Sequence, residues 1–187
     1  AFKFLKKKKE KKIYIWDDKK KSKTNINLSS FRKALNEVNY IVISPGINIK
    51  KTRFKSILFK NKKKIITDLD LFYMQQLAVK SIMVTGTNGK STTCKLIQHV
   101  LKTNKMDAQL GGNIGKPILD LKIKKKSIVV IEASSFQLSH LKFAKPTFAT
   151  ILNITKDHLD WHGTVKNYQD SKFNIFSNQD QKDQALL

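Results

Sequence analysis

The sequence predicts an α/β protein with two incomplete units: a Rossmann-like N-terminal domain and then a P-loop-type domain built on a parallel sheet. Apolar runs of strand length alternate with segments of helical periodicity, which is typical of β–α–β units. A hydrophobic content of 40% over 187 residues suffices for one or two cores. One glycine-rich stretch, residues 82–93, lies between a strand-like run and a helix-like pattern. We expect domains at residues 1–78 and 79–187.

Short strands and helices are expected to alternate in the first unit, because its apolar runs are brief and end at polar or turn-forming residues. The expected elements are the end of a helix at 2–5, a buried strand at 13–16, a helix at 31–38 capped by Ser29 or Ser30, a strand at 40–43, and a strand at 65–67. Asp68–Asp70 is expected to form a turn before the apolar segment 71–77.

Longer apolar runs in the second unit are typical of buried parallel strands, which are apolar on both faces. The expected elements are a strand at 82–85, a helix at 91–101, a glycine loop at 111–115, strands at 127–132 and 147–152, and a helix at 168–176. The order of these elements indicates a sheet whose loops meet at one edge.

The net charge of +23 first suggests a nucleic acid or another anionic partner. We set this interpretation aside, because nearly all basic residues are Lys in clusters between apolar runs, without interleaved aromatic residues. No apolar stretch approaches the ~20 residues that cross a bilayer, and the first apolar segment is too short for a signal peptide. A single cysteine, Cys94, suits the reducing cytoplasm, where we expect the protein to work.

The stretch I-M-V-T-G-T-N-G-K-S-T-T at residues 82–93 has the order strand, glycine loop, Lys-Ser and helix that holds nucleotide phosphates. Its glycines let backbone N–H groups approach phosphate oxygens. Lys90 is placed to reach the outer phosphates, and the Ser91 hydroxyl to bind Mg²⁺. The loop, G-x-x-G-K-S, is shorter than the common P-loop. The expected ATP contacts are Gly86, Thr87, Asn88, Gly89, Lys90, Ser91 and Thr92.

Polar side chains directly follow several expected strands. Glu132 and Asn153 each end an apolar run, and His158 comes soon after. Because ligands gather at the carboxyl ends of parallel strands, these positions suit Mg²⁺ and phosphate. Each also has an ordinary alternative: Glu132 as a helix cap, His158 as a surface residue, and Asp17 and Asp18 as turn residues. Residue chemistry alone therefore indicates a Mg²⁺-dependent nucleotide enzyme of open substrate identity.

Five stretches together resemble the Mur ligase family, and their order and spacing agree across about residues 13–178. They are Ser44-Pro45-Gly46-Ile47, Gly86-Thr87-Asn88-Gly89-Lys90-Ser91-Thr92, Gly111-Gly112-Asn113-Ile114-Gly115, Glu132-Ala133-Ser134-Ser135-Phe136-Gln137-Leu138, and Asn153-Ile154-Thr155-Lys156-Asp157-His158-Leu159-Asp160. Folylpolyglutamate ligases share the phosphate loop. The G-G-N-I-G and E-x-S-S-F-Q-L stretches point to the D-glutamate-adding branch of the family.

The resemblance implies an ATP-dependent acid–amino-acid ligase of peptidoglycan synthesis, which joins D-glutamate to UDP-N-acetylmuramoyl-L-alanine. The γ-phosphate of ATP would pass to the substrate carboxylate, and the D-glutamate amine would attack the resulting acyl phosphate. Two Mg²⁺ ions would clamp the reacting oxygens. We expect these two substrates as partners, a monomer, and neither a membrane nor a specific nucleic acid.

By the same resemblance, Lys90, His158 and Lys172 are the catalytic residues. The residues implied to hold Mg²⁺ are Ser91, Glu132, His158 and Lys172, the last in carbamylated form, because a carbamate is an anion where an ammonium would be repelled. The implied substrate contacts are Asp17, Asp18, Ser44, Pro45, Gly46, Asn113, Ser134, Gln137 and His158. Of these, Asp17 and Asp18 rest only on their position after an expected strand.

We expect the chain to be a fragment, because it begins without Met inside a helix-like segment. Against the family pattern, it lacks the first strand of the N-terminal domain and the whole C-terminal domain. Residues 1–187 alone are therefore predicted not to complete the reaction. Two alternatives stay open: another Mur or folylpolyglutamate-type amide ligase and, from a different class, a basic nucleic-acid-binding NTPase.

Overall fold

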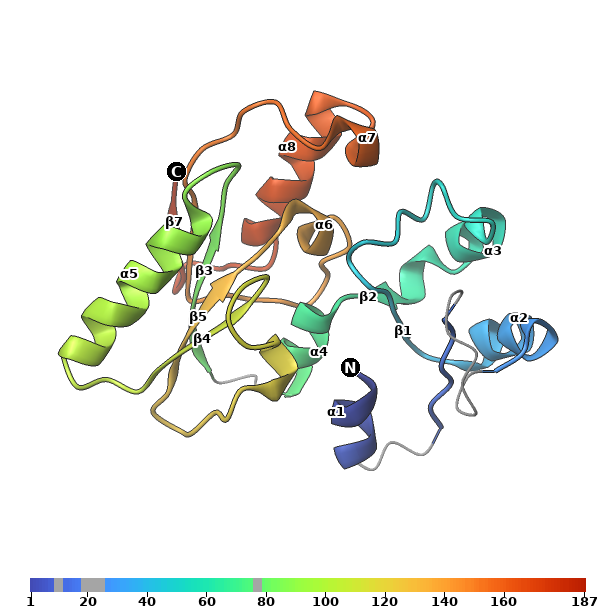
Figure 1. The fold of residues 1–187 in the computed structure, drawn as a ribbon, viewed down its shortest axis with the longest axis horizontal. Helices are drawn as coiled ribbons and strands as arrows, with labels where there is room; N and C mark the ends of the chain where they lie inside the picture. The colour runs from blue at the N-terminus through green and yellow to red at the C-terminus, as the bar shows by residue number, and fades with distance from the viewer. Residues whose placement is uncertain (9–11, 18–25, 76–78) are drawn as a thin grey trace. The chain divides into compact units, whose positions relative to one another are not determined.

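The computed structural model describes residues 1–8, 12–17, 26–75 and 79–187. It divides into two compact units, Ala1–Ile66 and Thr67–Leu187 (Figure 1). Both units combine helices with parallel strands, so the α/β class expected from the sequence is confirmed. The domain boundary expected after residue 78 lies later in the chain than this division after Ile66, with the helix Asp68–Gln75 between the two positions. The expected boundary stays a prediction. Within the described residues, no helix is both long and apolar enough to span a membrane.

The first unit is built around a two-stranded parallel sheet. Its elements are α1 (Phe2–Lys7), α2 (Leu28–Glu37), β1 (Ile41–Val42), α3 (Lys55–Lys60), a 3₁₀ turn (Lys62–Lys64) and β2 (Ile65–Ile66). β1 pairs with β2 in parallel, Ile41 opposite Ile65. A small core of buried residues packs beneath this pair: Ile43, Ile49, Leu58 and Ile65.

The strand expected at residues 13–16 is not formed. Ile15 makes only a single bridge, where its carbonyl accepts a hydrogen bond from the Ile26 N–H at 2.9 Å. Trp16 packs on Phe31 and Phe54, with ring centroids 4.7 and 5.4 Å away. This apolar run therefore serves aromatic packing rather than a sheet.

The cap of α2 also differs from the expectation. Asn27 is the N-cap, and its side-chain oxygen accepts a hydrogen bond from the Ser30 N–H at 2.8 Å. Ser29 and Ser30 lie inside the first turn of the helix. Asn is as good an N-cap as Ser, so composition alone did not select the residue.

The second unit is a five-stranded parallel sheet in the order β4-β5-β3-β6-β7. The strands are β3 (Lys80–Thr85), β4 (Ala108–Gly112), β5 (Ile128–Glu132), β6 (Phe148–Ile151) and β7 (Gln184–Leu186). The helices are α4 (Asp68–Gln75), α5 (Lys90–Thr103), α6 (Ser135–Leu138), α7 (Leu159–His162) and α8 (Val165–Phe173), with 3₁₀ turns at Ile118–Asp120 and Asn174–Phe176. The strands expected at 82–85, 127–132 and 147–152 and the helix at 91–101 are confirmed within a few residues.

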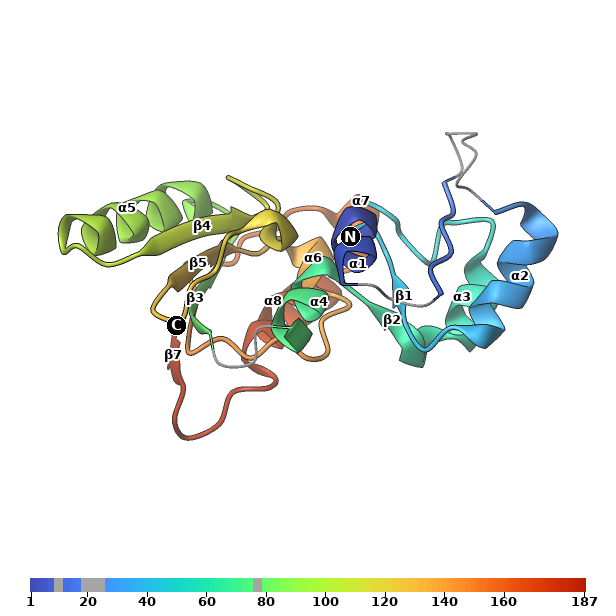
Figure 2. The same cartoon turned by 90° about the horizontal axis from the view of Figure 1, so that it is seen from below.

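Helices cover both faces of this sheet (Figure 2). On one face, Cys94 of α5 packs against Val84 and Val130. On the other, α4, α6 and the turn after α8 pack around Met83 and Ile131 of the sheet. Because every strand is parallel, the carboxyl ends of β3, β5 and β6 meet at one edge.

Two expectations need correction here, and one strand was missed. Gly111 and Gly112 belong to β4 rather than to a loop, because β4 pairs with β5 up to Gly112–Glu132. β7 was not expected at all. Asp68–Asp70 is the first turn of α4 and not a separate turn. Thr67 and Asp70 form its cap: Asp70 accepts from the Thr67 N–H at 2.9 Å, and the Asp70 N–H donates to Thr67 Oγ1 at 3.3 Å.

Candidate functional site

The loop after β3 takes a conformation that glycine makes possible. Gly86 has φ +156° and Gly89 has φ +81°, in the region that disfavours other residues. Gly89 is the N-cap of α5, and the first bond of that helix runs from the Thr93 N–H to its carbonyl at 3.0 Å. The N–H groups of the preceding first turn therefore have no acceptor within the helix. This helix start is suited to an anion such as phosphate.

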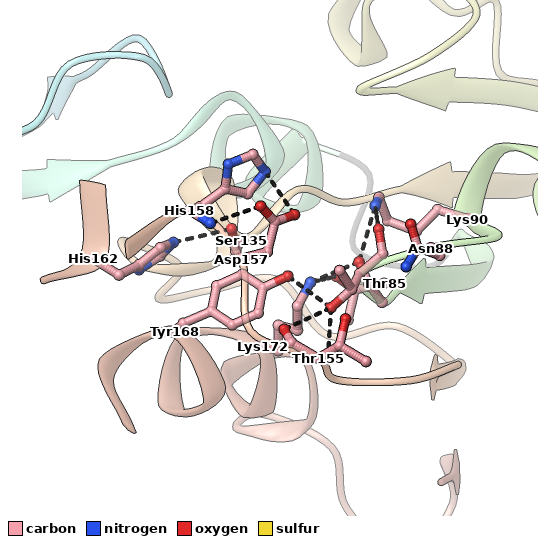
Figure 3. Close-up of polar contacts among 12 residues, drawn as sticks. Thr85, Asn88, Lys90, Ser135, Thr155, Asp157, His158, His162, Tyr168 and Lys172 are labelled. Atoms are coloured by element: carbon pink, nitrogen blue, oxygen red, sulfur yellow. Dashed lines mark hydrogen bonds and ion pairs between the residues drawn. The ribbon is translucent and has the colours of Figure 1, made fainter. Parts of the chain in front are cut away.

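Lys90 folds back over this loop (Figure 3). Its Nζ donates to the carbonyl oxygens of Gly86 at 2.9 Å and Thr87 at 2.7 Å. Asn153, in the segment after β6, holds the same loop: its Oδ1 accepts from the N–H groups of Thr87 at 3.1 Å and Asn88 at 2.9 Å. The ammonium group of Lys90, which is predicted to contact ATP, thus lies among the carbonyl oxygens of the loop.

Glu132, at the end of β5, contacts two other predicted site residues. Its side chain is 1% exposed and accepts from Ser91 Oγ at 2.7 Å and from Asn113 Nδ2 at 2.8 Å. Gly112 permits the close approach of the two strand ends, because a Cβ there would lie 2.3 Å from the backbone carbonyl oxygen of Glu132. The alternative that Glu132 caps the next helix is wrong, since Ser134 is the N-cap of α6.

This cluster fits Mg²⁺ in its chemistry. A hydroxyl and a carboxylate oxygen, from Ser91 and Glu132, are hard ligands that magnesium prefers. Over the described parts of the chain, no group of three or more His, Cys, Asp or Glu residues could hold a metal ion. A divalent cation held by Ser91 and Glu132 would take its remaining ligands from nucleotide phosphates and water.

Lys172 of α8 reaches the same loop from the other side. It is 1% exposed, its Nζ donates to the Gly86 carbonyl at 2.7 Å, and it lies 4.7 Å from the centre of the Tyr168 ring. Burial, together with the charge of Lys90, lowers the pKa of Lys172 to about 8, while Asp157 opposes this shift. A lysine with a lowered pKa has more of its amine in the neutral form near pH 7 to 8, and only the neutral amine is a nucleophile.

His158 begins α7 in a left-handed conformation, φ +49°. Its Nε2 lies 3.5 Å from Asp157 Oδ2, and its ring packs against Phe136 with centroids 4.9 Å apart. Figure 3 shows His158, Asp157 and Tyr168 gathered beside Lys172 and the phosphate loop. The structure thus brings the predicted catalytic histidine and both lysines to one edge of the sheet.

The predicted substrate contacts divide between the two units. Ser134 and Gln137 form a capping box at the start of α6, and Gln137 Nε2 donates to Asp68 Oδ1 at 3.2 Å. In the first unit, Ser44, Pro45 and Gly46 form the turn after β1, where the Ser44 carbonyl accepts from the Ile47 N–H at 2.9 Å. Asp17 is exposed, and Asp18 lies outside the described residues.

Four contributors to this site were not assigned from the sequence: Asn153, Thr155, Asp157 and Tyr168. Thr87 Oγ1 contacts the Tyr168 hydroxyl at 2.9 Å and accepts from the Thr155 N–H at 3.0 Å. Asn153 had a signal, because it ends an apolar run. Thr155 and Tyr168 contact the loop only after β3, β6 and α8 come together in the fold, so spacing alone could not reveal these contacts. Asp157 contributes through His158.

Comparison with known proteins shows which family the chain resembles in sequence. Residues 84–187 match the Mur ligase middle domain. The chain is similar to UDP-N-acetylmuramoylalanine–D-glutamate ligase of Aquifex aeolicus, 36% identical over 176 residues that make up 94% of this chain and 40% of that protein. The ligase of the same name from Rickettsia bellii is 42% identical over 148 residues, which are 79% of this chain and 32% of that protein.

Solved structures agree on the fold. MurF ligase of Thermotoga maritima in complex with ADP has a TM-score of 0.51 at 21% identity, over 81% of this chain and 43% of that one. The UDP-N-acetylmuramate:L-alanyl-gamma-D-glutamyl-meso-diaminopimelate ligase from Neisseria meningitides has a TM-score of 0.52 at 17% identity, over 82% of this chain and 53% of that one. The chain spans well under half the length of the curated relatives it matches. With a middle-domain match over more than half of its residues, this chain belongs to the Mur ligase family.

Proposed function

We propose that this chain is part of an ATP-dependent ligase that adds D-glutamate to UDP-N-acetylmuramoyl-L-alanine in the cytoplasm, as a step of peptidoglycan synthesis. The observation that carries the proposal is the contact of Glu132 with both Ser91 and Asn113, directly beside the phosphate loop. It joins the G-K-S loop to the G-G-N-I-G stretch that we assign to the D-glutamate-adding branch. The names of the curated relatives support the same branch.

In the proposed reaction, the phosphates of ATP lie on the loop from Gly86 to Thr92, at the start of α5. Lys90 leaves the carbonyl oxygens of Gly86 and Thr87 and turns its ammonium toward the β- and γ-phosphates. Phosphoryl transfer depends mainly on positioning and charge neutralisation, which these donors supply. The γ-phosphoryl group passes to the carboxylate of the muramoyl-alanine substrate. The D-glutamate amine then attacks the acyl phosphate, and phosphate leaves.

Ser91 and Glu132 are proposed to hold one Mg²⁺, and His158 and a carbamylated Lys172 a second. When bound, such ions neutralise phosphate charge and polarise the reacting oxygens. Lys172 reaches the carbamate state when its neutral amine attacks CO₂ and loses a proton, which leaves one negative charge on the new group. The burial and lowered pKa of Lys172 favour that neutral amine.

The remaining substrate contacts are proposed by likeness to the family. Asn113 and His158 would lie at the reacting carboxylate, and Ser134, with Gln137 behind it, at the muramoyl-alanine part. The residues proposed to lie around the uracil and diphosphate are Asp17, Asp18, Ser44, Pro45 and Gly46. The domain limits 1–78 and 79–187 and the monomeric state belong to the same proposal.

The test is phosphate release by the full-length product of the gene that encodes this chain, given ATP, Mg²⁺ and UDP-N-acetylmuramoyl-L-alanine. D-glutamate is compared with L-glutamate and L-lysine, and Lys90→Ala serves as the inactive control. Release that requires D-glutamate and disappears in Lys90→Ala supports the proposal. Release with a different amino acid would instead identify another ligase of the same scaffold. A salt-sensitive RNA affinity without any phosphate release would favour the nucleic-acid-binding alternative.

A further inference from the structure

Asn153 pairs with the backbone of the phosphate loop as a neighbouring strand would. Its Oδ1 accepts from the Asn88 N–H at 2.9 Å, and its Nδ2 donates to the Asn88 carbonyl at 3.1 Å. The same Oδ1 accepts from the Thr87 N–H at 3.1 Å, and the Asn153 backbone carbonyl also accepts from that N–H at 3.0 Å. One side chain therefore engages three backbone groups of two consecutive loop residues.

These bonds divide the donors of the loop into two groups. The N–H groups of Thr87 and Asn88 already have acceptors in Asn153. The next N–H groups, from Gly89 to Thr92, precede the first helical bond of α5, which is donated by Thr93. The N–H groups without an acceptor in Asn153 therefore lie at the helix start, where a phosphate would meet them, while the first half of the loop is tied to the segment after β6.

A second set of contacts fixes the same half of the loop. The Thr87 hydroxyl accepts from the Thr155 N–H at 3.0 Å and contacts the Tyr168 hydroxyl at 2.9 Å. Tyr168 is 1% exposed, so this contact comes from a buried side chain. The segment from Asn153 to Thr155 thus runs beside the loop, and its direct continuation is Asp157-His158.

We propose that Asn153 is the positioning residue of the phosphate loop. Its amide holds Thr87 and Asn88 so that the donors from Gly89 to Thr92 face the phosphates before nucleotide arrives. Preorganised donors bind an anion without the cost of ordering the loop at the moment of binding. The proposal rests on the proposed nucleotide site and goes beyond it, because Asn153 itself is assigned no contact with the nucleotide.

The experiment measures the affinity of the full-length protein for ADP and for ATP by titration calorimetry in the presence of Mg²⁺. Asn153→Ala removes all three side-chain bonds, and we expect it to weaken both affinities by about tenfold or more, since each such bond contributes modestly. Asn104→Ala is the matched control: Asn104 donates to the Val100 carbonyl at the far end of the same helix, at 2.8 Å. That variant is expected to bind as the unmodified protein does.

Hydrogen exchange separates positioning from a general loss of stability. We expect Asn153→Ala to speed exchange of the Asn88 amide most, because the Thr87 N–H keeps the Asn153 backbone carbonyl as an acceptor, while the amides of β3 and β6 stay protected. Asn153→Asp keeps Oδ1 as an acceptor and loses the donor, so it is expected to restore protection of the Asn88 amide but not nucleotide affinity, because of its charge. Unchanged affinity and exchange in Asn153→Ala would overturn the proposal. An unmodified protein that binds neither nucleotide would instead overturn the nucleotide site itself.

Discussion

Lys90 and Lys172 donate to the same acceptor, the carbonyl oxygen of Gly86, at 2.9 and 2.7 Å. The two cations come from different elements, one from the start of α5 and one from α8. The burial of Lys172 and then the nearby charge of Lys90 explain why the pKa of Lys172 falls to about 8. An arriving nucleotide offers Lys90 a stronger partner than a carbonyl, so nucleotide binding and the state of Lys172 are expected to be linked.

The first prediction concerns the reactivity of Lys172. With a pKa of about 8, half of its amines are neutral at pH 8, against about 0.3% for an ordinary lysine. In ¹³C-bicarbonate, we expect a carbamate signal by ¹³C NMR that grows as the pH rises from 7 to 9. Lys172→Arg should abolish it, whereas the exposed Lys156→Arg should keep it. A signal that persists in Lys172→Arg would contradict the assignment.

The same shift predicts how stability depends on pH. Between pH 8 and about 10.5, the unfolded chain holds the Lys172 proton and the folded chain does not. The contribution of Lys172 to the free energy of unfolding therefore rises with pH through this window. Lys172→Met should remove that part of the slope in urea unfolding at pH 7.5, 9 and 10. An unchanged slope in the variant would show that Lys172 has an ordinary pKa.

Glu132→Gln tests the metal role without changing the shape of the site. The amide oxygen can still accept a hydrogen bond from Ser91, although the bond from Asn113 is lost, and the amide lacks the charge that a divalent cation needs. We expect phosphate release to fall by about 100-fold or more, with a melting temperature close to that of the unmodified protein. Glu37→Gln, an exposed change at the Lys12 ion pair, is the control and should keep full activity. Mg²⁺-dependent release at the normal rate in Glu132→Gln would rule out this metal site.

Three glycines give a graded test of the backbone. Gly112→Ala would place a Cβ 2.3 Å from the Glu132 carbonyl at φ +108°, and we expect a loss of about 3 kcal/mol. Gly163 has φ +84° but open space, so Gly163→Ala should cost about 1 kcal/mol. Gly46 has open space without a positive φ, and its change should stay within about 0.5 kcal/mol. Urea unfolding measures all three, and equal losses would contradict the ordering.

Asp70 is a buried carboxylate that ties α4 to a distant loop. It is 0% exposed and accepts from the N–H groups of Thr67, Lys142 and Phe143 at 2.9, 2.9 and 2.7 Å. Asp70→Ala leaves one buried donor, the Thr67 N–H, and two part-buried donors without an acceptor, and we expect a loss of about 3 kcal/mol. Asp170→Ala, which breaks only an exposed pair with Lys166, should change stability by less than about 0.5 kcal/mol. A loss below 1 kcal/mol for Asp70→Ala would show that water replaces its bonds.

The sequence predicted those parts of the fold in which local pattern and burial agree. The strand that ends at Thr85 is a short apolar run, and the helix after Gly89 has apolar residues at helical spacing. The glycine loop lies between them. β4 was missed because its A-Q-L-G-G stretch has little strand propensity of its own, and pairing with β5 makes it a strand. The same holds for the unexpected β7, an edge strand of the described sheet that pairs with β6.

The candidate site shows the same limit. Lys90, Ser91 and Glu132 were placed by their position after apolar runs, and the structure brings Ser91 and Glu132 into contact. The role of Asn153 depends on β3 lying beside β6, which is a property of the sheet order and not of local sequence. Local pattern therefore locates residues at a sheet edge, whereas the partners of each residue follow from topology.

The most direct test of the proposed ligase follows one oxygen atom. UDP-N-acetylmuramoyl-L-alanine labelled with ¹⁸O in its carboxylate is incubated with ATP, Mg²⁺, D-glutamate and the full-length protein, and the phosphate released is analysed by mass spectrometry. An acyl phosphate forms through a carboxylate oxygen, which leaves with the phosphate when the amine attacks. We therefore expect one ¹⁸O atom in each phosphate, and no phosphate from the Lys90→Ala variant. Unlabelled phosphate would mean that water attacks ATP and would contradict the proposed reaction.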